Sequence, residues 1–227
     1  MAAALSLDIA AQSRVGHFSI IPKIGASIAN IIGESIATTE GGVLKPKYKA
    51  GFVGGVEGSY QVSDRFGVSL GVLYATLGNR YTDYSNLLSV AEDGKTSSYA
   101  GVHANRINLG YVQMPLIVAF QITEGLAVKT GMQVGMLTGA RQLYDETAYT
   151  MNTETGERAY GKPSNYDVDR RKNMNSTDFS IPIGLSYEYL NVVLDARYNF
   201  GLSKVSMQES GTRNSFFTFT VGYRFEL

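Results

Sequence analysis

Hydrophobic and polar residues alternate with a period of two in eight segments of this chain, and this alternation limits the fold more than any other feature. The segments are residues 16–27, 49–62, 66–77, 107–121, 126–139, 177–189, 192–203 and 214–227. A period of two places successive side chains on opposite faces of a β-strand. The alternation therefore predicts eight strands, each with one apolar face and one polar face.

The last segment shows the two faces most clearly. Its apolar face carries Phe217, Phe219, Val221, Tyr223, Phe225 and Leu227. Its polar face carries Thr218, Thr220, Gly222, Arg224 and Glu226. An apolar exterior and a polar interior are typical of a barrel in lipid, and a barrel has no free edge. We expect residues 214–227 to close such a barrel by pairing with the first strand; an edge strand of a soluble sandwich is the alternative for this segment taken alone.

The connections between these segments alternate between long and short. Short turns are expected at residues 63–65, 123–125 and 190–191, and long loops at residues 30–47, 79–105, 140–175 and 204–213. Outer-membrane barrels keep short turns at the periplasmic end and long loops outside. The pattern predicts an all-β fold, an eight-stranded antiparallel up-and-down transmembrane β-barrel with both termini on the periplasmic side. Within the longest loop, residues 144–160 are expected to form a hairpin that turns at Glu154-Thr155-Gly156 and projects beyond the bilayer.

Length and composition narrow the choice further. A chain of 227 residues fits one barrel domain, which we assign to residues 16–227. Residues 1–15 are interpreted as a signal-peptide remnant or a flexible N-terminus, because Ala11-Gln12-Ser13 has small residues at the spacing of a cleavage site. Equal numbers of basic and acidic residues, 20 of each, disfavour a nucleic-acid partner, and the absence of cysteine excludes disulfides and thiolate metal sites.

Several charged residues stand on the face assigned to the interior. They are Lys23, Glu57, Lys129, Asp178, Glu188, Asp195, Arg197 and Arg224. An eight-stranded barrel is narrow enough for side chains to fill it, and an isolated ion inside it would lose hydration without compensation. We therefore expect these residues to pair in a network that fills the lumen, so that no open pore remains.

Four short motifs occur in order along the chain. They are Tyr111-Val112-Gln113-Met114-Pro115-Leu116, Asp178-Phe179-Ser180-Ile181-Pro182-Ile183-Gly184, Leu194-Asp195-Ala196-Arg197-Tyr198 followed by Gly201-Leu202, and Val221-Gly222-Tyr223-Arg224-Phe225. Together they resemble the PorT-like outer-membrane β-barrel domain family, which is similar in architecture to OmpA- and OmpX-type barrels. The resemblance implies an integral outer-membrane protein without a defined activity. Gln113 and the ending Glu226-Leu227 depart from that family's usual pattern.

We do not expect a catalytic site or a metal site in this chain. His17 and His103 are the only histidines, and the barrel prediction puts them at opposite ends, which leaves neither a zinc cluster nor a Ser-His-Asp unit. The outer rim offers candidate hydrolytic groups in Asp83, Asp93, His103, Asp145 and Asp167. In polar loops such groups are usually solvated, so we predict no enzyme activity, no cofactor and no metal.

Three functions remain open. The first is a structural or surface-interacting barrel, monomeric and surrounded by outer-membrane lipid, whose loops contact an unidentified partner outside the cell. Its candidate interface residues are Tyr144, Tyr149, Tyr160 and Tyr166, because tyrosine combines a large contact area with a polar tip. The second is a passive small channel or a secretion-accessory barrel. The third is a soluble lipocalin-like ligand binder, which would require the apolar face inside and the polar face outside.

Overall fold

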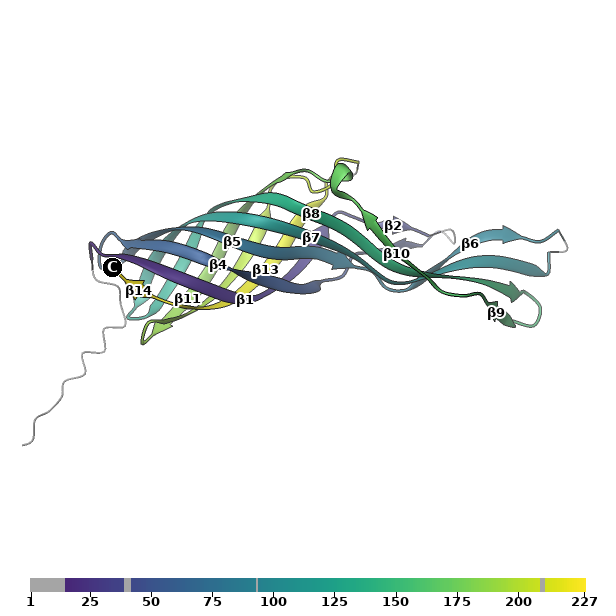
Figure 1. Ribbon diagram of the computed structural model, residues 1–227, viewed down its shortest axis with the longest axis horizontal. Coiled ribbons are helices and arrows are strands. Elements are labelled where there is room, and N and C mark those ends of the chain that lie inside the picture. The colour runs from purple at the N-terminus through teal and green to yellow at the C-terminus, as the bar shows by residue number, and fades with distance from the viewer. Residues whose placement is uncertain (1–14, 39–41, 93, 209–210) are drawn as a thin grey trace, which may run out of the picture.

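Eight long strands form a closed ring in the computed structural model, which describes residues 15–38, 42–92, 94–208 and 211–227 (Figure 1). The ring strands are β1 (Phe18–Ile32), β4 (Lys49–Gln61), β5 (Phe66–Arg80), β7 (Thr96–Thr123), β8 (Leu126–Asn152), β11 (Thr177–Tyr189), β12 (Val192–Gly201) and β13 (Arg213–Tyr223). Every neighbouring pair is antiparallel. The predicted eight-stranded antiparallel barrel is confirmed. Residues 1–14 of the expected signal-peptide remnant, which was assigned to residues 1–15, lie outside the described residues.

The last strand closes the ring against the first. Lys23 faces Gly222 and Ile32 faces Arg213 across the β1–β13 pair. After Arg224 the chain resumes as β14 (Phe225–Glu226), which pairs with Ser19 and Ile20 of β1. The prediction that residues 214–227 close the barrel is therefore confirmed.

The apolar face of the strands lies outside the barrel and the polar face inside. In β13, Phe219 is 48% exposed whereas Thr218 is 7% exposed. The same contrast recurs around the ring, with Leu70 and Ile183 exposed and Gln113 buried. An exterior of this kind is soluble only in lipid. A lipocalin-like barrel would have the opposite arrangement, so that alternative is wrong.

Short turns gather at one end of the barrel. They join β4 to β5 at residues 62–65, β7 to β8 at residues 124–125, and β11 to β12 at Leu190 and Asn191. Both residues of the last turn have positive φ, 47° and 67°. This is the type I′ conformation, whose twist matches that of the flanking strands. The predicted short turns at this end are confirmed.

The long connections after β5 and β8 are mainly β-structure, so the interpretation of residues 79–105 as a loop is wrong, whereas the hairpin expected within residues 140–175 is present. β7 and β8 continue well beyond the barrel, flanked by β6 (Tyr84–Val90) on one side and by β9 (Arg158–Tyr160) and β10 (Ser164–Asp169) on the other. Asn152, the last residue of β8, follows Leu143 by nine residues, and Leu143 faces Arg106, where the pairing of β7 with β5 ends. At about 3.3 Å per residue this is about 30 Å of strand. We call β6, β9, β10 and the parts of β7 and β8 beyond Arg106 and its partner Leu143 the projecting sheet (Figure 1).

The alternation failed to reveal the projecting sheet because the buried positions of β7 there hold small or polar residues, among them Ser97, Ala100 and Asn105. Alternation is recognised from large apolar residues on one face of a strand. Outside the membrane the backbone hydrogen bonds persist without that pattern. The hairpin predicted to turn at residues 154–156 is confirmed, since Met151 faces Arg158 across a turn at residues 153–155.

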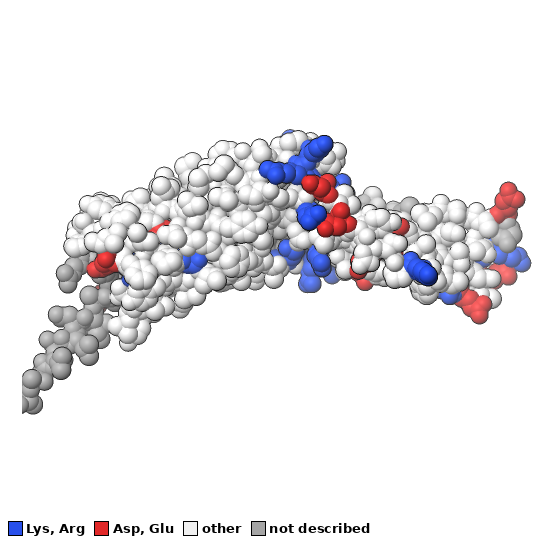
Figure 2. Space-filling view, viewed as in Figure 1, with Lys and Arg blue, Asp and Glu red and all other residues white. Residues whose placement is uncertain are grey.

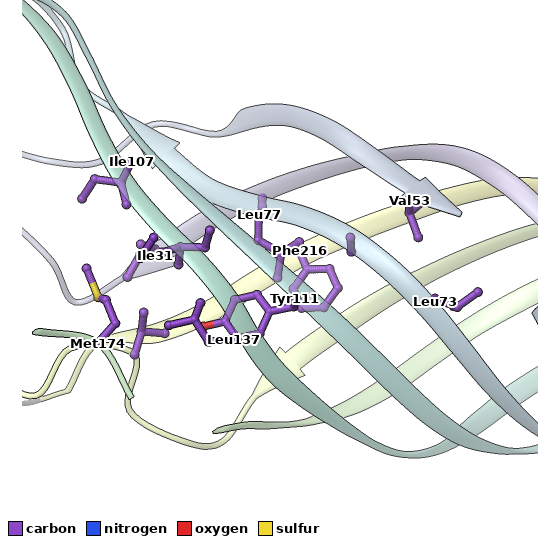
Figure 3. Close-up of a cluster of buried hydrophobic side chains, with 14 of the residues drawn as sticks. Ile31, Val53, Leu73, Leu77, Ile107, Tyr111, Leu137, Met174 and Phe216 are labelled. Carbon is purple, nitrogen blue, oxygen red and sulfur yellow. The ribbon is translucent and has the colours of Figure 1, made fainter. Parts of the chain in front are cut away.

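An apolar cluster fills the lumen at the end away from the short turns, although the residues assigned to the interior face predicted a polar lumen. Figure 3 shows Ile31, Leu77, Tyr111, Leu137 and Phe216 directed toward one another inside the barrel. A small hairpin of β2 (Ile36–Ala37) and β3 (Val43–Leu44) in the expected 30–47 loop packs Ile36 and Leu44 against the cluster. The 3-10 helix η1 (Arg171–Asn173) lies at the same end.

Candidate functional site

Five charged side chains meet inside the barrel, in the half nearer the short turns. They are Lys23, Glu57, Lys129, Asp195 and Arg197, and we call them the central charge cluster. Lys23 Nζ lies 2.6 Å from Glu57 Oε2, and Lys129 Nζ lies 2.7 Å from Asp195 Oδ2. Arg197 contacts both carboxylates at 2.7 Å and donates a hydrogen bond of 2.9 Å to Asp195 Oδ2. Every carboxylate and cation of the cluster therefore has a partner of opposite charge.

Glycines make room for these long side chains in the narrow lumen. The directly opposed pairs are Lys23 with Gly222, Glu57 with Gly71, and both Lys129 and Arg197 with Gly184. A Cβ atom added at Gly71 would lie 2.7 Å from Glu57 Cγ, and one at Gly184 would lie 2.8 Å from Arg197 Cγ. Real side chains do not approach this closely. The positions of the glycines thus determine where the charged side chains fit.

Glu188 and Arg224 form a separate pair nearer the short turns. Arg224 donates from Nε to Glu188 Oε1 at 2.8 Å and from Nη2 to Glu188 Oε2 at 2.9 Å, which is the bidentate geometry of a strong ion pair. Its Nη1 donates to Ser19 Oγ at 2.7 Å. A cavity of about 20 Å³, lined by Glu57, Lys129, Glu188 and Arg224 among others, separates this pair from the central charge cluster. It has room for about one water molecule.

Asp178 lies apart from both groups, beside the apolar cluster. Its Oδ1 accepts hydrogen bonds from Asn214 Nδ2 at 2.9 Å and from Ser203 Oγ at 3.4 Å. Asn214 Nδ2 also lies 3.4 Å from the Tyr111 hydroxyl. Among the described residues Asp178 has no ion-pair partner. The eight charged residues predicted to line the lumen thus form three groups rather than one network.

Tyrosines form two rows on the projecting sheet. Tyr99, Tyr149 and Tyr160 face one another across β7, β8 and β9, with ring centroids 5.1 Å and 5.3 Å apart. Tyr144 and Tyr166 face each other across β8 and β10, with centroids 4.9 Å apart and nearly parallel rings. Tyr99 was missed because it lies in residues 79–105, which lack alternation.

The two rows lie on opposite faces of the projecting sheet. Tyr144 and Tyr149 are five residues apart on β8, and an odd separation in a strand places side chains on opposite sides. Tyr166 and Tyr160 follow their partners, since directly opposed residues share a face. The four predicted interface tyrosines therefore do not form one surface. Tyr160 is the most exposed of them, at 63%, and Arg158 lies 5.6 Å from the centre of the Tyr149 ring.

The candidate hydrolytic groups are only partly brought together. His103 Nδ1 lies 3.1 Å from Asp83 Oδ2, and Asp145 faces His103 on β8. The hydrogen bond with His103, together with one from the Ala104 N–H, holds the pKa of Asp83 below its usual value. Asp167 is paired instead with Arg141 at 3.1 Å, and Asp93 lies outside the described residues. His17 is at the other end of the barrel.

Neither a metal cluster nor a membrane-spanning helix occurs in the described part of the chain. The described residues contain no group of three or more histidine, aspartate or glutamate side chains placed to hold a metal ion. They also contain no helix long and apolar enough to cross a membrane.

Comparison with known proteins identifies a family. Residues 10–206 match the family described as "Outer membrane protein beta-barrel domain". No curated protein matches the sequence.

Similar solved structures include the attachment invasion locus protein Ail of Yersinia pestis, with 15% identity over 93% of this chain and 100% of that chain and a TM-score of 0.40. Neisserial surface protein A has 16% identity over 92% and 97% of the two chains, with a TM-score of 0.36. The N-terminal β-barrel domain of Pseudomonas aeruginosa OprF has 14% identity over 93% and 98%, with a TM-score of 0.33.

Proposed function

Because the chain belongs to the outer-membrane protein β-barrel domain family, and so lies in the bacterial outer membrane, we propose that its barrel is an anchor for the projecting sheet, which binds a partner outside the cell. The observation that carries this proposal is the projecting sheet itself, which extends about 30 Å along β8 from Leu143, level with the end of the β5–β7 pairing, to Asn152. Short turns alone would suffice to connect barrel strands. An ordered sheet of this length presents contact area that a barrel does not need for its own closure.

The row of Tyr99, Tyr149 and Tyr160 supports a contact with protein. Tyrosine rings supply rigid contact area at low cost in side-chain entropy, and they concentrate in binding interfaces. Arg158, beside the Tyr149 ring, adds a second residue type that is common in such interfaces. We therefore place the contact on the face of this row, with Tyr160 and Arg158 at its exposed edge.

Removing the projecting sheet tests this proposal. Tyr84, Val102, Glu146 and Ser164 face one another at one level of the sheet. Replacing residues 84–102 and residues 146–164 each by Asn-Gly would cut the sheet at that level and supply two-residue hairpin turns. We expect the truncated barrel to fold and to keep its compact mobility on unheated gels. Crosslinking on intact cells should recover an external partner with the full chain and lose it with the truncated chain.

The two tyrosine rows provide a matched comparison. Tyr149→Ser with Tyr160→Ser removes rings from one face, and Tyr144→Ser with Tyr166→Ser removes the same number from the other. We expect the first double variant to lose binding of the recovered partner and the second to keep it. Equal loss in both variants, or binding that survives truncation, would contradict the proposal.

A passive channel is less favoured than an anchor, because the central charge cluster and the apolar cluster occupy the lumen in the described residues. The more specific likeness to PorT-like barrels stays a prediction, as does the secretion-accessory role that accompanies it. Monomeric assembly is also still a prediction. The proposal assigns no catalytic role to the Asp83–His103 pair.

A further inference from the structure

Three cations form a row across the outer surface where the strands leave the barrel. Lys47, just before β4, pairs with Arg80 at the end of β5, and Arg80 directly faces Arg106 on β7. Directly opposed residues of antiparallel strands project from the same face. All three side chains are exposed. We call Lys47, Arg80 and Arg106 the cation row.

The positive charge of the cation row is not balanced within the described part of the protein. None of the three side chains forms an ion pair with a carboxylate of the described residues, and Arg80 Nε donates to the backbone oxygen of Tyr48 at 3.1 Å. The nearby Arg141 on β8, in contrast, is paired with Asp167. Like charges directly opposed in a sheet destabilise it. An anion from outside the chain would remove this cost.

The row lies at the edge of the lipid-facing surface. The exposed Ile32 at the end of β1 lines one surface hollow together with Pro46, the residue before Lys47. Figure 2 shows lysine and arginine side chains, with acidic side chains among them, where the largely uncharged barrel surface meets the projecting part. The long connections lie on the outer side of the membrane in barrels of this type. The row is therefore level with the headgroups of the outer leaflet.

We propose that the cation row binds the phosphate groups of lipid headgroups in the outer leaflet. Adjacent strands are about 4.8 Å apart, so one phosphate can accept hydrogen bonds from two neighbouring members of the row. Arginine matches the geometry of phosphate oxygens with its paired N–H groups, and both arginine and lysine can lay their apolar stems along the barrel while the charge reaches the headgroup. Dissolved phosphate has the same chemistry but gains nothing from the position of the row.

Lipid retention measures this binding. The full chain would be placed in nanodiscs of phosphatidylcholine with a minor fraction of phosphatidic acid, then released for native mass spectrometry to obtain the ratio of the two retained lipids. We expect a preference for phosphatidic acid that falls with salt. Lys47→Gln, Arg80→Gln and Arg106→Gln together should reduce the preference by about a hundredfold, since each surface cation contributes about fivefold.

Matched variants separate the row from general charge and from folding. Lys95→Gln, Arg158→Gln and Lys162→Gln remove the same charge from the projecting sheet and its connecting turns and should leave the preference unchanged. Arg80→Lys with Arg106→Lys should preserve most of it. Heat-dependent gel mobility checks that each variant folds. Equal retention of both lipids by the unaltered chain, or equal loss in the charge control, would overturn the proposal.

Calorimetric titration of inorganic phosphate into the detergent-solubilised barrel distinguishes the source of the anion. We expect no binding of the free ion. Two results together would overturn the assignment to lipid: phosphate binding that disappears in the triple glutamine variant, and no lipid preference of the unaltered chain in nanodiscs. The cation row would then bind a dissolved anion.

Discussion

Asp195 is the residue on which the central charge cluster depends most, because it contacts Lys23, Lys129 and Arg197. The cluster holds three cations and two carboxylates. Asp195→Asn would leave all three cations with Glu57 as their only counter-charge. Breaking a buried ion pair in this way costs about 3–5 kcal/mol, so we expect a loss of that size in the free energy of unfolding. Urea titration, followed by the disappearance of the compact band on unheated gels, measures it.

Lys129→Gln is the comparison for Asp195→Asn. It leaves two cations and two carboxylates, so the remaining charges still balance. We therefore expect a smaller loss than in Asp195→Asn. An Asp195→Asn variant as stable as the unaltered protein would show that the cluster does not support the barrel.

At this scale the sequence predicted which side chains point inward but not which of them meet. A period of two determines the face of the strand, and Asp178, Glu188 and Asp195 all stand on the interior face as predicted. Their height in the lumen depends on the stagger between strands, which alternation does not encode. This is why Asp178 lies beside Tyr111 and Asn214, away from the central charge cluster.

Among the elements, the pair β11–β12 is held by a close approach that only glycine permits. A Cβ atom at Gly184 would lie 2.3 Å from the backbone oxygen of Ala196, besides its contact with Arg197. We expect Gly184→Ala to destabilise the barrel by about 1–3 kcal/mol through overpacking. Gly139→Ala on β8 is the matched control, because an added Cβ there meets nothing within 4 Å. The same urea titration compares the two, and equal midpoints would contradict the steric argument.

The elements were predicted well where one face meets lipid and poorly elsewhere. The bounds of β11 agree with the predicted segment 177–189, and those of β4 differ from 49–62 by one residue. β7 begins at Thr96 instead of residue 107, since the buried positions of the added residues, such as Ser97, Ala100 and Asn105, are small or polar and carry no periodic signal. The apolar cluster escaped prediction because Tyr111, Leu73 and Ala75 stood on a face that the charged residues had marked as polar.

For the whole molecule, a filled lumen predicts a barrel without a large steady ion conductance. The central charge cluster and the apolar cluster lie in series along the axis, and the cavity lined by Glu57 and Glu188 is about 20 Å³. We expect planar-bilayer recordings to show no large steady conductance. The comparison is a triple variant that lacks three large side chains of the apolar cluster, Tyr111→Ala, Leu137→Ala and Phe216→Ala. Steady openings of porin size in the unaltered protein would contradict the prediction.

The pairing of β1 with β13 also limits when the molecule can fold. Lys23 and Gly222 are neighbours in the barrel although nearly the whole described chain lies between them. Until those distant segments meet, the growing sheet has two open edges whose backbone groups can pair with another chain. Contacts of such long sequence separation form slowly. We therefore expect assembly to be a late and slow event that requires the unfolded chain to be protected from aggregation on its way to the membrane.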